Sequence, residues 1–264
     1  MSAETTAQEP GSLLDLLTLE RLDDDHFRAD FVFSEIEHLY GGQVAAQALL
    51  AAGRTVEDGR LPHSLHGYFL RAGDAAHPTE FRVDRDRDGR SFSARRVVAL
   101  QRDEVIFSMA ASFTVAGPGL DAQAEDLPVV TAPEDCPSWE ARRMFSVDAR
   151  IPPEDGITEW PSRFWSRFTA GIGSDPLLNA AAMTYLTDFS AALHTFETDG
   201  FLPAASLDHA VWFHRPVLMD DWVFTTYDGR TIAGNRGLYT GSYYDRDGRL
   251  VASMAQEALY RKLR

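Results

Sequence analysis

Asp188 is the residue whose type and surroundings first suggest chemistry. It lies in TYLTDFSAAL, residues 184–193, where its neighbours are apolar or small. The apolar spacing predicts a helix over residues 177–196, with one stripe made of Leu186, Phe189, Leu193 and Phe196. Asp188 then has no solvated face, and a buried carboxylate is costly unless it is protonated or hydrogen bonded. It therefore either bonds to local backbone and hydroxyl groups or takes part in a reaction.

Gln256 is a second polar residue at a position predicted to face the core. In the last strand, period-two alternation puts these residues on one face: Leu250, Ala252, Met254, Gln256 and Ala258. A related strand in the first half has Ala111 at the matching position. A core-facing amide can be a satisfied structural group, but the asymmetry indicates that only the second half carries a polar site.

Patterns for nucleophilic, metal and nucleotide chemistry are missing. Ser206, Asp208 and His209 are close in sequence, but on a continuous strand Ser206 and His209 would point to opposite faces, which argues against a catalytic triad. We expect His209 to be a core or interface residue. The sequence contains no G-x-S-x-G, H-E-x-x-H, paired C-x-x-C or phosphate-binding glycine pattern. We therefore expect no metal and no tightly bound cofactor.

Composition limits the partners. The 264 residues carry a net charge of -15, which would repel nucleic acid and anionic lipid. No uncharged apolar run reaches about 18 residues, and the N-terminal segment is polar and acidic. We expect no membrane span and no secretory signal, and we place the protein in the cytoplasm. Cys136, the single cysteine, is expected to be chemically idle.

Two related segments show that the chain contains an internal repeat. HSLHGYFLR (63–71) with the tail FSMAASF (107–113) resembles ASLDHAVWFHR (205–215) with the tail ASMAQEALY (252–260). The shift is 144 between Phe69 and Phe213 and 145 between Met109 and Met254. The near-constant shift predicts two units of the same fold.

Each unit contains an apolar helix and long strands, which predicts an α+β fold with an antiparallel sheet wrapped around a buried helix. In the first unit the helix spans residues 41–54, and strands follow at 91–101 and 104–113. Residues 115–140 are rich in Pro, Gly and acids and are interpreted as a linker. The predicted organisation is an N-terminal repeat over 1–114, a linker over 115–140 and a C-terminal repeat over 141–264.

Five ordered motifs resemble the acyl-CoA thioesterase II family. They are GGQVAAQAL (41–49), HSLHGYFLRAGD (63–74), DGRSFSARRV (88–97), SLDHAVWFHRP (206–216) and DGRLVASMAQE (247–257). The resemblance implies a tandem double hotdog fold and hydrolysis of acyl-CoA to fatty acid and free CoA. It also implies that Asp188, Ser206 and Gln256 hold the attacking water, with Asp188 as general base. Ser206 stands where the family more usually has Thr, which keeps the hydroxyl.

Other expectations accompany this resemblance. The CoA phosphates need positive charge, for which the candidates are Arg90, Arg95, Arg96, Arg230 and Arg236. Acyl length would depend on side chains such as Phe189 and Trp212, and a homo-oligomer is expected. Two other functions stay open: a noncatalytic acyl-CoA-binding or acyl-ligand-binding hotdog protein, and a hotdog enoyl-CoA hydratase that uses a histidine such as His66 or His209 with a carboxylate.

Overall fold

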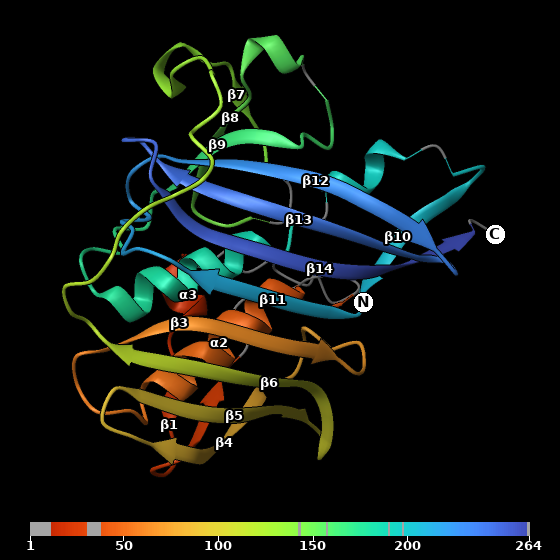
Figure 1. Ribbon diagram of the computed structural model, residues 1–264. Coiled ribbons are helices and arrows are strands. Elements are labelled where there is room, and N and C mark those ends of the chain that lie inside the picture. Colours follow the sequence, from red (N-terminus) through yellow and green to blue (C-terminus); the bar gives the residue numbers. More distant parts are fainter. Residues whose placement is uncertain are drawn as a thin grey trace, which may run out of the picture.

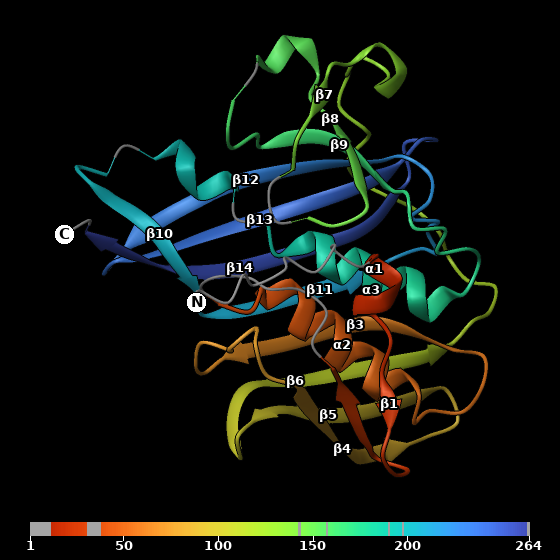
Figure 2. The same ribbon diagram turned by 180° about the vertical axis from the view of Figure 1, so that it is seen from behind.

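The two halves of the chain build one continuous antiparallel sheet. The computed structural model describes residues 12–30, 38–141, 144–156, 158–189, 191–196 and 198–262, without the side chains at positions 191 and 195. Over these residues the strand order is β1-β2-β4-β5-β6-β3-β11-β14-β13-β12-β9-β8-β7, and β10 pairs with β14 beside this path. Figures 1 and 2 show that each half of the sheet curves around its own helix.

The first half contains one long helix and the strands on one side of the sheet. Its elements are α1 (Leu13–Leu16), β1 (Glu20–Arg21), β2 (His26–Ala29), α2 (Gly41–Gly53), β3 (Arg60–Phe69), β4 (Thr79–Asp88), β5 (Phe92–Gln101) and β6 (Glu104–Val115). The predicted helix over 41–54 and the two predicted strands are confirmed to within about two residues. Phe107, Met109, Ala111 and Phe113 are buried, as the alternation predicted.

The second half repeats this arrangement. Its strands are β7 (Ser138–Trp139), β8 (Val147–Arg150), β9 (Arg163–Phe168), β10 (Phe201–Ser206), β11 (Asp208–Phe213), β12 (Val223–Ala233), β13 (Arg236–Asp245) and β14 (Leu250–Lys262). Its helices are α3 (Pro176–Thr187) and the short 3-10 turns η1 (Pro133–Asp135), η2 (Pro153–Asp155) and η3 (Ala191–Thr195). Since β5 and β13 both begin and end 144 positions apart, the predicted repeat is visible in the fold.

The two halves meet through paired strands and packed helices. β3 pairs antiparallel with β11, for example Leu65 with Val211, which joins the two parts of the sheet (Figure 1). Behind the strands, α2 and α3 run antiparallel. A Cβ at Gly42 would lie 2.6 Å from the backbone oxygen of Tyr185, and one at Gly53 would lie 2.4 Å from the side chain of Leu177. Glycine at both ends of α2 therefore permits the close helix contact.

The predicted helix over residues 177–196 is wrong in its second part, because α3 ends at Thr187 and Asp188 is its C-cap. The last carbonyl groups of α3 accept bonds from side chains elsewhere. Tyr40 Oη donates to Tyr185 O at 3.0 Å, and Tyr227 Oη donates to Leu186 O at 3.4 Å. These tertiary contacts satisfy carbonyl groups at the end of the helix. Asp188 therefore lies at a helix end, where its carboxylate meets other elements.

Residues 115–140 are mostly irregular, as expected of a linker, but their last part joins the sheet. β7 pairs with β8 at the sheet edge. Cys136 is buried there. The domain boundaries stay predictions. Among the described residues, no helix has the length and apolar character needed to cross a membrane.

Candidate active site

Asp188 lies in the interior and is surrounded by hydrogen-bond donors. The residue is 7% exposed. Its Oδ1 accepts bonds from Gln256 Nε2 at 2.7 Å and from Ser206 Oγ at 3.1 Å. Gln256 Nε2 also donates to Ser206 Oγ at 2.6 Å. The three predicted site residues therefore form one hydrogen-bonded group, although they come from a helix end and two strands that are far apart in sequence.

Ser206 and His209 both reach Gln256, so the expectation that they point to opposite faces is wrong. The reason is a break in the strand at Leu207, between β10 and β11. Leu207 N–H donates to Glu257 O at 2.8 Å, while its carbonyl accepts from Phe69 N–H at 3.0 Å. The break changes the alternation, and Ser206 faces the same interior as His209.

A nucleophilic triad still does not form. Asp208 accepts a hydrogen bond from the backbone N–H of Glu257 at 2.7 Å, and this bond holds its carboxylate against β14. His209 Nδ1 makes a short contact with Gln256 Oε1, and its Nε2 lies 2.8 Å from Thr187 Oγ1. His209 is fully buried, which confirms that it is a core residue. Its ring touches the carboxamide of the site and not the serine hydroxyl.

The first turn of α2 closes the site from the other half of the chain. The backbone N–H of Gly42 lowers the pKa of the Asp188 carboxylate. A Cβ at Gly41 would lie 2.6 Å from Asp188 Oδ2 and 2.8 Å from the ring of Phe69. The N-terminal end of a helix carries partial positive charge and stabilises a nearby anion. The α2 N-terminus thus supplies N–H groups and a favourable field to the carboxylate.

Burial dominates the protonation of the site. It raises the pKa of Asp188, while the nearby His209 and the bonds from Gln256, Ser206 and Gly42 act in the opposite direction. It also lowers the pKa of His209, against the effect of Asp188. When ionised, a carboxylate with a raised pKa is a better proton acceptor than an exposed one.

Tyr239 adds a hydroxyl group near the site. It lies directly opposite Gln256 in the pairing of β13 and β14, so both side chains share the inner face. Tyr239 is fully buried, and its hydroxyl has no hydrogen-bond partner among the described residues. Burial raises its pKa well above the usual value, and Asp188 adds to this shift.

An aromatic cluster begins directly after Asp188. The buried ring of Phe189 contacts Trp139, Trp160 and Phe164 at centroid distances of 5.5, 5.8 and 5.7 Å. Trp160 stacks on His194 at 4.2 Å, and both line a cavity of about 470 Å³. Trp212 is 38% exposed and packs on His66 at 5.1 Å. Trp212 therefore lies on the outer face of the sheet.

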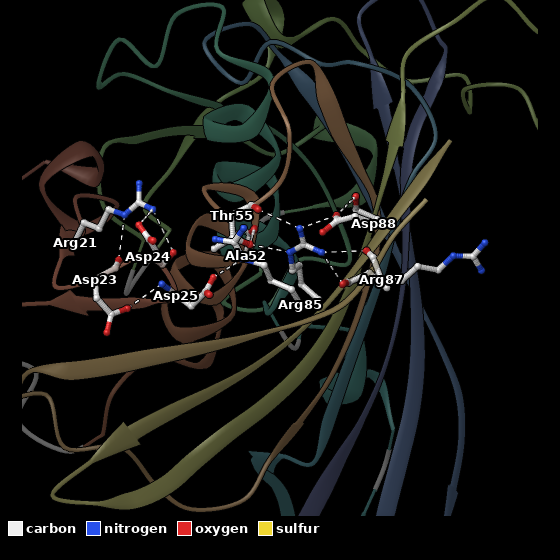
Figure 3. Close-up of polar contacts among 12 residues, drawn as sticks. Arg21, Asp23, Asp24, Asp25, Ala52, Thr55, Arg85, Arg87 and Asp88 are labelled. Carbon is white, nitrogen blue, oxygen red and sulfur yellow. Dashed lines mark hydrogen bonds and ion pairs between the residues drawn. The ribbon is translucent and has the colours of Figure 1, made fainter. Parts of the chain in front are cut away.

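The corresponding place in the first half holds a structural network instead. Arg95 of β5, the position that matches Tyr239, is 1% exposed. It donates to Thr55 Oγ1 at 2.8 Å, to Thr55 O at 3.0 Å and to Asp88 Oδ1 at 2.8 Å. Figure 3 shows Thr55 and Asp88 at this network, while the side chain of Arg87 points away and its carbonyl oxygen accepts from Arg95 at 3.1 Å. The first half therefore lacks a matching acidic site.

The network also removes Arg95 from the candidate contacts to a CoA phosphate, since its guanidinium is occupied in the interior. Three of the exposed candidates have acidic neighbours. Arg96 pairs with Asp86 at 2.9 Å, and Arg236 pairs with Glu257 at 3.0 Å. Arg230 lies 3.6 Å from Asp228.

Three features of the site were not found from sequence: the approach of Gly41 and Gly42, the contact of His209 with Gln256, and the unpaired hydroxyl of Tyr239. A signal for His209 was present in the repeat. The shift of 144 aligns it with Leu65, so a polar residue replaces an apolar one next to the Gln256 position. The glycine contacts join separate halves, and no local pattern encodes them.

Two family profiles and several known proteins match this chain. A family profile described as the acyl-CoA thioesterase C-terminal domain matches residues 121–260, and one described as the acyl-CoA thioesterase N-terminal domain matches residues 32–114. Acyl-CoA thioesterase 2 of Haemophilus influenzae is 34% identical, covering 95% of this chain and 97% of its own.

Solved structures agree with these matches. An acyl-CoA thioesterase II from Mycobacterium marinum has a TM-score of 0.83 and 38% identity, covering 96% of this chain and 99% of its own. A hot dog fold protein from Alicyclobacillus acidocaldarius has a TM-score of 0.77 at 19% identity, covering 95% and 98%, which bears on the fold alone. The predicted double hotdog architecture is confirmed.

Proposed function

Because the chain belongs to the acyl-CoA thioesterase II family, we propose that Asp188, Ser206 and Gln256 position and activate the water that hydrolyses an acyl-CoA thioester. The observation that carries the proposal is the shared contact of Ser206 and Gln256 with one carboxylate oxygen, Asp188 Oδ1, in a buried place. The second carboxylate oxygen, Oδ2, faces Gly41. The bonds from Ser206 and Gln256 are both made to Oδ1 and not to this oxygen.

Asp188 acts as the general base. It accepts one proton from water as the water oxygen attacks the thioester carbonyl carbon. When the tetrahedral intermediate collapses, the carbon–sulfur bond breaks, and the CoA thiolate takes up the proton that Asp188 accepted. The products are a fatty acid and free CoA. A positioned base typically contributes about 10² to 10⁴-fold.

The N-terminal end of α2 stabilises the charge that develops on the carbonyl oxygen. Support comes from the position of Gly41 and Gly42 against Asp188, which puts the positive end of the helix beside the reacting atoms. The thioester would then lie between this helix end and the carboxylate. The aromatic cluster around Phe189 is next to Asp188 and is suited to an acyl chain.

Incubation of the purified protein with a panel of acyl-CoAs and a thiol-detecting reagent tests the function. We expect thiol release by the wild type and a loss of about 10² to 10⁴-fold in kcat for Asp188→Asn. Ser206→Ala and Gln256→Ala should also lower kcat. Ser253→Ala is the matched control, because Ser253 lies on the same strand as Gln256 but contacts the exposed His214. An Asp188→Asn variant with the wild-type rate would contradict the mechanism.

The same assay separates the two alternative functions. Tight binding of acyl-CoA without thiol release would indicate a binding protein, and addition of water to an enoyl-CoA would indicate a hydratase. Against a hydratase that uses His66 stands the position of this residue on the outer face beside Trp212, since a catalytic histidine would have to face the interior. His209 faces the interior, but its two ring nitrogens contact Gln256 and Thr187. A cytoplasmic location and a homo-oligomer stay predictions.

A further inference from the structure

The carboxamide of Gln256 has to be held in one of two orientations. Its amide nitrogen can only donate hydrogen bonds and its oxygen can only accept them. In the observed orientation the nitrogen faces Asp188 and Ser206. A rotation of the carboxamide by half a turn would place its oxygen against the carboxylate, and the two groups would repel each other. The contact with Ser206 Oγ would also change. The water site therefore depends on which end of the amide faces Asp188.

His209 is the group that distinguishes these two ends. Its Nδ1 contacts Gln256 Oε1. Since a carbonyl oxygen cannot donate, Nδ1 must carry the proton for this contact to be a hydrogen bond. The flipped amide would place its N–H₂ group against the Nδ1–H, with two donors facing each other. His209 thus favours the orientation that the site needs, but only in the tautomer protonated at Nδ1.

Thr187 completes the arrangement on the other side of the ring. Its Oγ1 donates to Thr184 O at 2.8 Å and lies 2.8 Å from His209 Nε2. The hydroxyl has a single proton, so it can donate either to Thr184 O or to the bare Nε2 of a ring protonated at Nδ1. In the tautomer that orients Gln256, the Thr187 hydroxyl turns from Thr184 O to Nε2 and supports the bare nitrogen there.

The first half of the chain shows that the fold itself does not need this polar pair. The shifts of 144 and 145 align His209 with Leu65 and Gln256 with Ala111. Leu65 and Ala111 are direct partners on β3 and β6, and both are buried. An apolar pair thus fills the same place in the same fold. His209 and Gln256, the polar pair of the second half, are therefore explained by a role other than packing.

We propose that His209 is a positioning residue for the hydrolysis, whose Nδ1–H holds the amide nitrogen of Gln256 toward Asp188 and Ser206 while Thr187 supports the required tautomer. The inference rests on the proposed function. His209 does not touch the reacting atoms and acts entirely through Gln256. Its contribution to the rate must therefore disappear when Gln256 is removed.

A double-mutant cycle tests this dependence. The variants are His209→Leu, Gln256→Ala and the double variant, which carries the apolar pair of the first half and is therefore expected to fold. We expect His209→Leu to lower kcat by about 10²-fold with little change in KM. The double variant should be no slower than Gln256→Ala alone. Losses that multiply in the double variant, or an unchanged kcat in His209→Leu, would overturn the proposal.

A conservative variant and a spectroscopic measurement distinguish positioning from a purely structural role. His209→Asn keeps an N–H donor near the place of Nδ1 and should recover kcat to within about tenfold of the wild type. Nitrogen-15 NMR of the wild-type protein at neutral pH should show His209 protonated at Nδ1 and bare at Nε2. A ring protonated only at Nε2 contradicts the proposal, and this readout needs neither activity nor a substituted protein.

Asp188→Asn separates this proposal from the proposed function. If Asp188→Asn keeps the wild-type rate, the hydrolytic mechanism fails, and the positioning role fails with it. If Asp188→Asn is inactive while His209→Leu hydrolyses at the wild-type rate, only the positioning role fails.

Discussion

The backbone N–H of Gly42, in the first turn of α2, acts on the carboxylate of Asp188, the C-cap of α3, and lowers its pKa. The two residues belong to different halves of the chain, so the candidate site is a product of how the halves pack. Asp188, Ser206 and Gln256, the proposed catalytic side chains, all lie in the second half. The helix end that faces them comes from the first.

Gly41→Ala should impair the reaction more than the fold. The added Cβ would lie 2.6 Å from Asp188 Oδ2 and would displace the carboxylate from its position. We expect kcat to fall by about 10²-fold or more. Gly53→Ala at the other end of α2 is the control, since it meets only the flexible side chain of Leu177. It should cost about 1 kcal/mol in urea unfolding and leave kcat unchanged. Equal losses of kcat in both variants would contradict the assignment.

The rate should depend on the ionisation of Asp188. Because burial raises the pKa of this carboxyl, the acid limb of kcat/KM against pH should have its midpoint above the value of about 3.9 for an exposed aspartate. The bond from Ser206 lowers the pKa of Asp188, so its loss in Ser206→Ala should move the limb to higher pH. A limb that stays in place would show that another group controls the profile.

The same pKa shift predicts how Asp188 affects stability. A raised pKa in the folded state means that folding favours the protonated carboxyl, and this contribution is lost as the pH rises through the folded-state value. Asp188→Asn should therefore gain stability relative to the wild type as the pH rises from acid toward neutrality, measured by urea unfolding at several pH values.

Asp88→Asn provides a control of opposite sign. Bonds from Ser93 and Arg95 lower the pKa of Asp88. Its contribution is present above the unfolded-state pKa and is lost as the pH falls, so Asp88→Asn should lose stability relative to the wild type toward neutral pH. If the two variants show the same trend with pH, the interpretation of Asp188 is wrong.

Tyr239→Phe should leave the protein as stable as the wild type or more so. The Tyr239 hydroxyl is buried without a partner among the described residues, and such a group costs about 1 to 3 kcal/mol. Tyr243→Phe is the matched comparison, because the Tyr243 hydroxyl donates to Tyr227 Oη at 2.9 Å and its loss should cost about 1 kcal/mol. Unfolding in urea measures both. A destabilised Tyr239→Phe would reveal a partner for its hydroxyl.

Arg95→Met should destabilise the fold without changing catalysis. The substitution leaves the buried Thr55 contacts without their donor, which we expect to cost about 2 kcal/mol. The neighbouring Arg96 is exposed and pairs with Asp84 and Asp86, so Arg96→Met should leave the stability close to that of the wild type. Thermal unfolding and kcat report both effects. A loss of kcat in Arg95→Met beyond the unfolded fraction would mean that the network influences the site.

The repeat, the two buried helices and the strands could be predicted from sequence, because apolar periodicity and small residues are local properties that each half shows twice. The same logic identified Asp188 and Gln256 as polar groups at buried positions. Local reasoning failed where a distant contact overrides it. Tyr40 and Tyr227 take over the last carbonyls of α3 and end the helix before Asp188, and the strand breaks at Leu207.

The sequence by itself therefore determined which residues carry polar chemistry and which architecture surrounds them, since burial patterns and repeats are written along the chain. Only the tertiary structure decided how these groups meet. The contact of Gly42 with Asp188 and that of His209 with Gln256 join residues separated by 146 and 47 positions. Their geometry follows from the antiparallel packing of α2 on α3 and the pairing of β11 with β14. The helix and strand propensities of the local sequence do not determine this packing.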